Sequence, residues 1–433
     1  MRIHFVKLVL LITMFVISSG DLIAQLNWTK YPDNPVFSGQ PGTWYAYLSM
    51  CSVLYNPDSS RYEMWFTAGA QAEFPYNIGF AWSEDGISWN VHTSNPVLTS
   101  TPGGWDAYMV FDPLVIRENG QYKMWYAGIE TTALLTKIGY ATSTDGIEWQ
   151  KDNLNNPVLL AGTASWESAA VSHPFVMPSS NGYKMWYSGS AAGASESAIG
   201  YATSPDGINW QKDILNNPVL LSGAIGEWDR IVYGPEILYI DSLYYMYYTG
   251  QNNLYQSDKV GLATSYDGIH SWYKHGPVLQ ATPGQWDGSR TILGSVFMED
   301  GTLKMYYAGS SGSNWEIGLA TSPFVPVSVE DETIQPTRFS LEQNFPNPFN
   351  TSSVIKYSIP QSSEVAIKVF DILGNEIETL VNEEKSLGTY EVTWYAENLP
   401  SGVYFYQLRG SALQSKDGKA GNYIDTKKMI LLK

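Results

Sequence analysis

Three ionisable side chains, Asp112, His173 and Glu236, stand beside prolines at similar points of three successive stretches of the chain. Cleavage of a glycosidic bond needs two carboxyl groups, because one protonates the leaving oxygen while the other attacks or activates water. Asp112 is the candidate base or nucleophile, and Glu236 is the candidate general acid if its surroundings keep it protonated. His173 is a candidate substrate contact, with an interior hydrogen-bonded histidine or a ligand of a central cation as alternatives.

Further residues near the same predicted face are candidates for substrate binding. They are Arg290, Trp315, Tyr108 and Tyr233. An aromatic face packs against sugar C–H groups, while nearby polar groups bind hydroxyls. Two alternatives stay open: Trp315 as an anchor of its own loop, and Arg290 as a partner of Asp287.

The elements that must position these residues belong to a repeat. The motif Ser-x-Asp-Gly-Ile-x-Trp recurs with a period of about 61 residues, at Ser83–Trp89, Ser143–Trp149 and Ser204–Trp210, and one residue longer at Ser265–Trp272. Each unit also carries an Asn-Pro-Val or Gly-Pro-Val step, a tryptophan, and an aromatic run whose alternation is typical of strands. About four strands in each of five units predict an all-β, five-bladed β-propeller.

The ends of the array indicate how the ring closes. The fifth unit stops near Pro323 without the last strand of the motif, and the segment from Leu26 to Lys30 matches that missing strand. Pairing the two removes two exposed sheet edges. We therefore expect the N-terminal strand to complete the last blade.

A residue type that recurs in every blade is expected to serve the scaffold. The aspartate of the motif resembles the Asp-box of sialidases, but its recurrence predicts a tight turn, which Asp and Gly favour. Thirteen of the sixteen tryptophans are also locked to the repeat. The acid after the second tryptophan of each unit is expected to be structural as well; it occurs as Asp106, Glu167, Asp229 and Asp287.

Composition and the chain's first residues limit the possible settings. Residues 1–25 have the basic start, apolar run and small-residue end of a secretory signal peptide. No later stretch is apolar enough to be a membrane-spanning helix. The formal net charge of −17 opposes binding to nucleic acid. The lone Cys51 is expected in the core, without a disulfide.

The last part of the chain, residues 338–433, follows a linker at 326–337 and resembles the type A sorting domain of the bacterial type IX secretion system. The resemblance rests on Asn344-Phe345-Pro346-Asn347-Pro348-Phe349, Gly402-Val403-Tyr404-Phe405-Tyr406 and the ending Lys427-Lys428-Met429-Ile430-Leu431-Leu432-Lys433. It implies a small β-sandwich, recognition by the secretion machinery at the outer membrane, and release or display at the cell surface. An ordinary immunoglobulin-like module is the alternative.

Residues 26–325 resemble, in architecture and short motifs, the five-bladed glycoside hydrolases of the arabinanase, xylosidase and invertase kind. The resemblance implies three carboxylates on innermost strands, with Asp112 and Glu236 at two of those positions. The chain departs from that pattern: either His173 replaces the supporting aspartate, or the nucleophile position falls at Cys51 or Ser52. Glu73, Glu130 or Glu196 from the loops is a candidate replacement for the missing carboxylate.

The sequence therefore predicts a secreted or surface-displayed glycoside hydrolase acting on a neutral poly- or oligosaccharide. The alternative is a non-catalytic carbohydrate-binding or adhesion propeller. We expect neither a metal ion nor another cofactor, since no Walker, Rossmann or zinc-spacing motif is present.

Overall fold

The computed structural model describes residues 28–70, 75–131, 135–191, 197–253, 256–312, 314–324, 339–341, 343–344, 347–396, 399–412 and 422–432. The predicted signal peptide and linker lie outside these residues. The chain divides into two compact units, one holding the repeats and one holding the C-terminal strands. Each unit is described separately.

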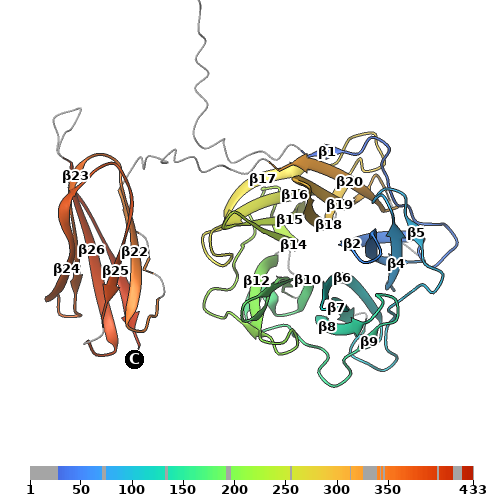
Figure 1. Ribbon diagram of the computed structural model, residues 1–433, viewed down its shortest axis with the longest axis horizontal. Helices are drawn as coiled ribbons and strands as arrows, with labels where there is room; N and C mark the ends of the chain where they lie inside the picture. Colours follow the sequence, from blue (N-terminus) through green and yellow to red (C-terminus); the bar gives the residue numbers. More distant parts are fainter. Residues whose placement is uncertain are drawn as a thin grey trace, which may run out of the picture. The chain divides into compact units, whose positions relative to one another are not determined.

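The repeats form five four-stranded antiparallel sheets arranged around a ring, which confirms the predicted propeller (Figure 1). Blade 1 contains β2 (Tyr47–Asn56), β3 (Arg61–Gly69), β4 (Asn77–Ser83) and β5 (Asn90–Val91). Blade 2 contains β6 (Met109–Glu118), β7 (Gln121–Ile129), β8 (Thr136–Ser143) and β9 (Gln150–Lys151). Blade 3 contains β10 (Ala170–Ser179), β11 (Gly182–Ser190), β12 (Ser197–Ser204) and β13 (Gln211–Lys212), preceded by the short 3₁₀ helix η1 (Ser165–Glu167).

Blade 4 contains β14 (Ile231–Ile240), β15 (Leu243–Asn253), β16 (Gln256–Ser265) and β17 (Tyr273–Leu279). Blade 5 contains β18 (Arg290–Glu299), β19 (Thr302–Ser310), β20 (Glu316–Pro323) and the N-terminal β1 (Thr29–Lys30). The first strand of each blade is innermost, and the later strands lie progressively outward (Figure 1). Strand β1 pairs with β20 in the register Thr29↔Thr321 and Lys30↔Ala320. The predicted closure of the ring is confirmed.

The aspartates of the repeated motif build the turn before each fourth strand. In blade 1, the Asp85 carboxylate accepts hydrogen bonds from the backbone N–H groups of Ile87 (2.8 Å) and Ser88 (2.7 Å), and from the Ser83 hydroxyl (2.8 Å). These donors stabilise the charged carboxylate, and they hold its pKa well below the usual range. The same bonds recur at Asp145, Asp206 and Asp267, so the structural interpretation of this motif is confirmed.

Repeated tryptophans join neighbouring blades. The fully buried indoles of Trp65, Trp125 and Trp186 each donate a hydrogen bond of 2.7–2.8 Å from Nε1 to a turn carbonyl of the next blade. Burying an aromatic ring and satisfying its N–H together makes each residue a strong contact between blades. These tryptophans therefore serve the scaffold, as the repeat predicts.

The acids that follow the second tryptophan also serve the scaffold. Each is buried and pairs with the lysine of the fourth strand in its own blade, and each accepts a hydrogen bond from a buried tyrosine of the second strand. The pairs are Asp106–Lys151, Glu167–Lys212, Asp229–Lys274 and Asp287–Lys30. A buried carboxylate with both a cation and a hydroxyl partner is satisfied, and it is not available for catalysis.

The C-terminal unit consists of two antiparallel sheets, in the orders β21-β22-β25 and β24-β23-β26-β27. The bounds are β21 (Ser340–Leu341), β22 (Ser352–Ile359), β23 (Ser363–Phe370), β24 (Glu376–Lys385), β25 (Gly388–Tyr395), β26 (Gly402–Ala412) and β27 (Asn422–Leu431). Both sheets contribute to one core, in which Trp394 and Tyr406 are fully buried. This is the predicted β-sandwich. In neither unit do the described residues include a helix long and apolar enough to cross a membrane.

Candidate active site

The innermost strands share an irregularity near their first residues. The register between the first and second strand shifts at this level in all five blades. In three blades the shifted residue has a left-handed backbone: Asp112 has φ 50°, His173 has φ 47° and Gly234 has φ 61°. Glycine adopts this conformation freely, whereas another residue incurs a cost of about 1–3 kcal/mol. Two chemically active side chains thus occupy positions where the scaffold accepts glycine.

Hydroxyl groups of the preceding blades fix the backbone at this level. The N–H of Asp112 donates to Thr67 Oγ1 (2.9 Å), and the N–H of Gly234 donates to Ser188 Oγ (2.9 Å). A Cβ atom at Gly234 would lie 2.9 Å from Met50 Cε and 3.8 Å from His173 Cδ2. Blades 1, 3 and 4 therefore meet here. From blade 1, the side chain of Met50 reaches this level.

Asp112 and His173 lie against each other. His173 Nε2 is 3.1 Å from Asp112 Oδ2. That oxygen is buried, and its one polar contact among the described residues is with this ring nitrogen. Burial is the cause of both pKa shifts: it raises the pKa of Asp112 to about 8 and lowers the pKa of His173 to about 3. At neutral pH, Asp112 holds its proton and His173 is uncharged.

A chain of contacts runs from His173 into blade 4. The Nδ1 atom of His173 lies 2.7 Å from the Ser172 hydroxyl, and its ring lies 5.3 Å from the Tyr233 ring. The Tyr233 hydroxyl donates to Asp258 Oδ1 (3.1 Å), and Gln251 donates to the same oxygen. Asp258 is fully buried. The tyrosine is therefore held in place by a carboxylate that the sequence did not single out.

Arg290 completes a group of contacting residues that we call the axial cluster: Asp112, His173, Tyr233, Asp258 and Arg290. Its guanidinium forms an ion pair with Asp258 and lies 4.7 Å above the Trp315 ring. The alternative of an Arg290–Asp287 pair is wrong, because Asp287 is bound by Lys30 and by the Tyr307 hydroxyl (3.2 Å). Arg290 is thus a cation held in place by a carboxylate and an aromatic ring.

Trp315 is half-buried and packs against Met50, Ile292 and Ala308, the apolar residues next to the axial position. Its contact with Arg290 covers one face of the ring. Trp315 thus lies beside Arg290 and Met50. Tyr108 is half-buried, and its N–H donates to the Ile129 carbonyl (2.9 Å).

Glu236 lies two residues beyond the level of Asp112 and His173. Its Oε2 accepts the backbone N–H of Val296 in the next blade (3.2 Å). The Ser52 and Ser295 hydroxyls accept matching N–H groups at 3.0 and 3.2 Å. At the equivalent position of two other blades, a serine hydroxyl forms this bond to the next blade. Glu236 thus occupies a position that serves to link neighbouring blades. Burial raises its pKa to about 8, and among the described residues no hydrogen bond or ion pair joins it to Asp112.

The remaining candidates lie outside the cluster or outside the described residues. Glu130 is exposed and lies 3.6 Å from Lys137, whereas Glu73 and Glu196 are not among the described residues. Cys51 is buried, and burial raises the pKa of its thiol. Within the described ranges, no group of three or more His, Cys, Asp or Glu side chains is placed to hold a metal ion.

Sequence reasoning missed Asp258. Its signal was weak but present: it is the one carboxylate in the variable segment between Gln251 and Lys259, and Arg290 is an arginine without a counterpart in the other blades. Only the register of β15 and β16, which pairs Gln251 with Asp258, brings these side chains together.

Residues 343–418 match the family of secretion system C-terminal sorting domains. The C-terminal unit is therefore a sorting domain, and it directs the chain to the cell surface or the extracellular space.

Two relatives match part of the chain in sequence. An uncharacterized protein of Mycobacterium tuberculosis is 30% identical over 31% of this chain and 44% of its own length. A 1,2-β-oligomannan phosphorylase of a Thermoanaerobacter species is 25% identical over 38% of this chain and 73% of the relative. The chain thus spans less than half of the length of the mycobacterial relative.

Solved structures share the propeller fold. A glycoside hydrolase matches with a TM-score of 0.56 and 19% identity, over 68% of this chain and 92% of that one. The β-1,2-mannobiose phosphorylase of Listeria innocua matches with a TM-score of 0.53 and 13% identity, over 69% and 97% of the two chains. The propeller therefore has the fold of five-bladed glycoside hydrolases and phosphorylases.

Proposed function

We propose that the propeller cleaves glycosidic bonds in a neutral poly- or oligosaccharide outside the cell, with Asp112 donating the proton to the leaving oxygen. The observation that carries this proposal is a buried carboxyl group that lies against the uncharged ring of His173, at a position where the scaffold accepts glycine. Strained backbone is a cost that persists mainly at functional sites.

The roles in this proposal differ from those expected from the sequence. A base or nucleophile must be ionised at the working pH, but burial raises the pKa of Asp112 to about 8, which suits an acid at neutral pH. Glu236 is also protonated there, and its carboxyl group is engaged with Val296. Inorganic phosphate is then the attacking group that fits best, because it is already an anionic nucleophile and leaves bonded to the sugar. Attack by water would also need a base to take up its proton.

Substrate contacts are proposed for the groups around Asp112. His173, Tyr233 and Trp315 supply an aromatic wall, and the fixed guanidinium of Arg290 supplies hydrogen-bond donors. Such a mix of apolar surface and few polar groups is usual in small-molecule sites. Tyr108 is proposed at the rim.

A second candidate function is carbohydrate binding without cleavage. It is favoured by the bond between Glu236 and Val296, which repeats a structural link formed by serines in other blades. A propeller that uses one carboxylate as a link lacks the usual pair for hydrolysis.

The test is an assay of cleavage on neutral oligosaccharides, including β-1,2-mannobiose, with and without inorganic phosphate. We expect Asp112→Asn to lower kcat by roughly 10²–10⁴-fold, the usual range for loss of an acid. Products that carry phosphate only in its presence would identify phosphorolysis. Glu148→Gln, at an exposed turn, is the matched control.

Saturable binding with no turnover under either condition would support the second candidate, and Trp315→Ala should then weaken binding. Full activity of Asp112→Asn on a cleaved substrate would rule out the proposed role of Asp112.

A further inference from the structure

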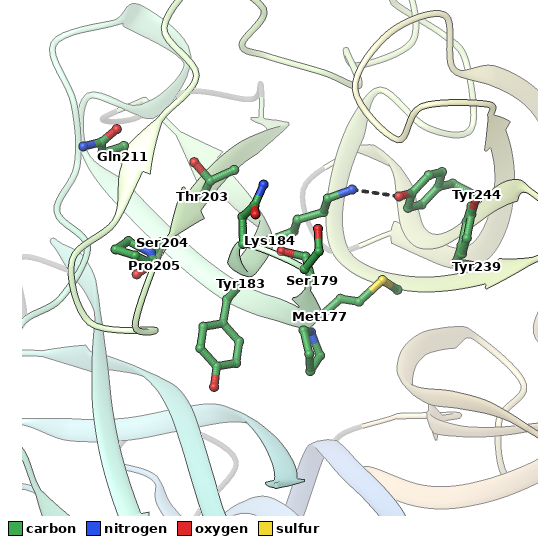
Figure 2. Close-up of a pocket in the computed structure, with 13 residues that line it drawn as sticks. Met177, Ser179, Tyr183, Lys184, Thr203, Ser204, Pro205, Gln211, Tyr239 and Tyr244 are labelled. Atoms are coloured by element: carbon green, nitrogen blue, oxygen red, sulfur yellow. Dashed lines mark hydrogen bonds between the residues drawn. The ribbon is translucent and has the colours of Figure 1, made fainter.

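A groove of about 800 Å³ opens where blades 3 and 4 meet (Figure 2). It is lined by the last residues of β10, Met177 to Ser179, whereas His173 near the start of the same strand belongs to the axial cluster. The groove and the axial cluster are therefore at opposite ends of β10. None of the residues proposed for glycosidic cleavage lines this groove.

Two other junctions between blades have a group of charged and hydroxyl side chains at this level. Between blades 2 and 3, Lys123 Nζ contacts the Glu118 carboxylate (2.5 Å) and the Tyr183 hydroxyl (2.6 Å). Between blades 5 and 1, Lys304 makes the same contacts with Glu299 and with the Tyr62 hydroxyl (2.8 Å). In both, a lysine, a glutamate and a tyrosine form a closed, charge-balanced triad.

The junction of blades 3 and 4 has the lysine and the tyrosine but not the glutamate. Lys184 Nζ reaches the Tyr244 hydroxyl at 2.8 Å (Figure 2). Ser179 takes the position of the glutamate. The last residue of the first strand faces the first residue of the second strand, and this last residue is Glu118 in blade 2 and Ser179 in blade 3. Within the described part of the chain, Lys184 forms no ion pair. The ammonium group of Lys184 thus lines the groove without the carboxylate that balances its counterparts.

The rest of the groove suits a sugar ring. The Tyr239 side chain is 52% exposed and is held against Tyr244, with ring centroids 4.4 Å apart. Hydroxyl and amide groups line the remaining wall; they belong to Ser179, Ser180, Asn181, Thr203 and Gln211. The nearby Asp206 carboxylate is occupied by backbone N–H groups of its own turn. A fixed aromatic face beside many neutral donors and acceptors is the usual lining of a saccharide site.

We propose that this groove binds an acidic saccharide, with the carboxylate of a uronic acid residue on the Lys184 ammonium and its ring against Tyr239. The sugar carboxylate takes the place that Glu118 and Glu299 occupy in the other junctions. Because the whole chain carries a formal charge of −17, general electrostatic attraction does not explain such binding. Recognition must be local to Lys184 and its neighbours.

The direct test restores the glutamate. In Ser179→Glu, the new carboxylate completes the triad with Lys184 and Tyr244, as in two other junctions, so the variant is expected to fold. Calorimetric titration of the full chain with trigalacturonic acid should show saturable binding, and Ser179→Glu should weaken it about tenfold or more, since a charge-assisted bond is lost. Lys184→Gln should have a similar effect.

Two controls separate a uronate site from a general anion site and from a site that recognises the sugar alone. The methyl ester of the same oligosaccharide lacks the charge and should bind at least about tenfold more weakly. The variant Lys137→Gln alters an ion pair in blade 2, away from the groove, and should bind trigalacturonic acid like the wild type. Competition by inorganic phosphate as strong as that by the uronate would show a general anion site and overturn the saccharide assignment. Absence of uronate binding, or unchanged binding by Ser179→Glu, would overturn the proposal, whatever the outcome at Asp112.

Discussion

Asp112 and His173 lower the folding stability of the propeller. Both have left-handed backbones at a position that Gly234 fills in the next blade, and both are held uncharged by burial. The comparison with blade 4 shows this cost, because glycine occupies the position there and adopts the same backbone conformation without strain. A stability cost at an axial carboxyl group is what a site selected for activity is expected to show.

The pH dependence of stability follows from these pKa shifts. The folded state keeps the Asp112 proton up to about pH 8, whereas the unfolded chain loses it near pH 4. The contribution of Asp112 to the free energy of unfolding is therefore greatest below pH 4 and decreases as the pH rises towards 8. Asp112→Asn should raise the free energy of unfolding by about 1–3 kcal/mol at pH 8 and by less at pH 4.

Thermal unfolding of wild type and variant across this pH range measures the difference. His173 acts in the opposite direction, since its pKa is lowered to about 3, but it is present in both proteins and its contribution largely cancels. A variant that is equally destabilised at every pH would show that Asp112 is a structural residue.

At the scale of strands and blades, the ring is closed by β1 and by the residues after it, which bond to β20 as far as the bridge Phe37↔Ile317. Strand β1 forms only a short ladder with β20, but Lys30 also bonds to the Gln280 carbonyl (2.6 Å), the Thr282 hydroxyl (2.8 Å) and the buried Asp287. The lysine therefore contributes more to closure than the ladder length suggests.

Replacement of Lys30 tests this contribution. In Lys30→Gln, the Asp287 carboxylate stays buried without its cation, so we expect the propeller to lose about 1–3 kcal/mol of stability. Denaturant unfolding followed by tryptophan fluorescence measures this loss. Lys137→Gln removes an exposed pair and should cost less than about 1 kcal/mol; equal losses in both variants would contradict the special role of Lys30.

The repeat made the blades, their turns and their closure predictable, because each of these features recurs with a fixed spacing. The site was less predictable, because it depends on register. A register shift between Leu48 and Cys51 interrupts the pairing of the innermost strand in blade 1, and the pairing of Gln251 with Asp258 decides which carboxylate holds Arg290. Contacts between residues that the sequence separates by many positions, such as Glu236 with Val296, carry no local signal.

At the scale of the whole chain, the two units have separate roles. The propeller carries the axial cluster and the groove, and the sorting domain carries the export signal. The core of the sorting domain is its own, with both sheets packing around Trp394. We expect each unit to keep its role when the other is altered.

Removal of residues 339–433 tests this separation. The shortened chain should remain inside the cell envelope instead of reaching the surface or the medium, because the signal read at the outer membrane is gone. Its glycan cleavage in a cell extract should equal that of the full chain. Immunoblots of the cell and medium fractions measure the first result, and export of the shortened chain would contradict it.

The central claim is that Asp112 acts as a protonated acid, and the pH profile of kcat/KM on a cleaved oligosaccharide tests it most directly. Since burial raises the pKa of Asp112 to about 8, we predict a profile that falls about tenfold per pH unit above that value. The fall should persist in Glu236→Gln, whose own carboxyl group also has a raised pKa. A rate that instead rises through pH 8 would show that Asp112 works ionised, as a base or nucleophile, and would contradict the account.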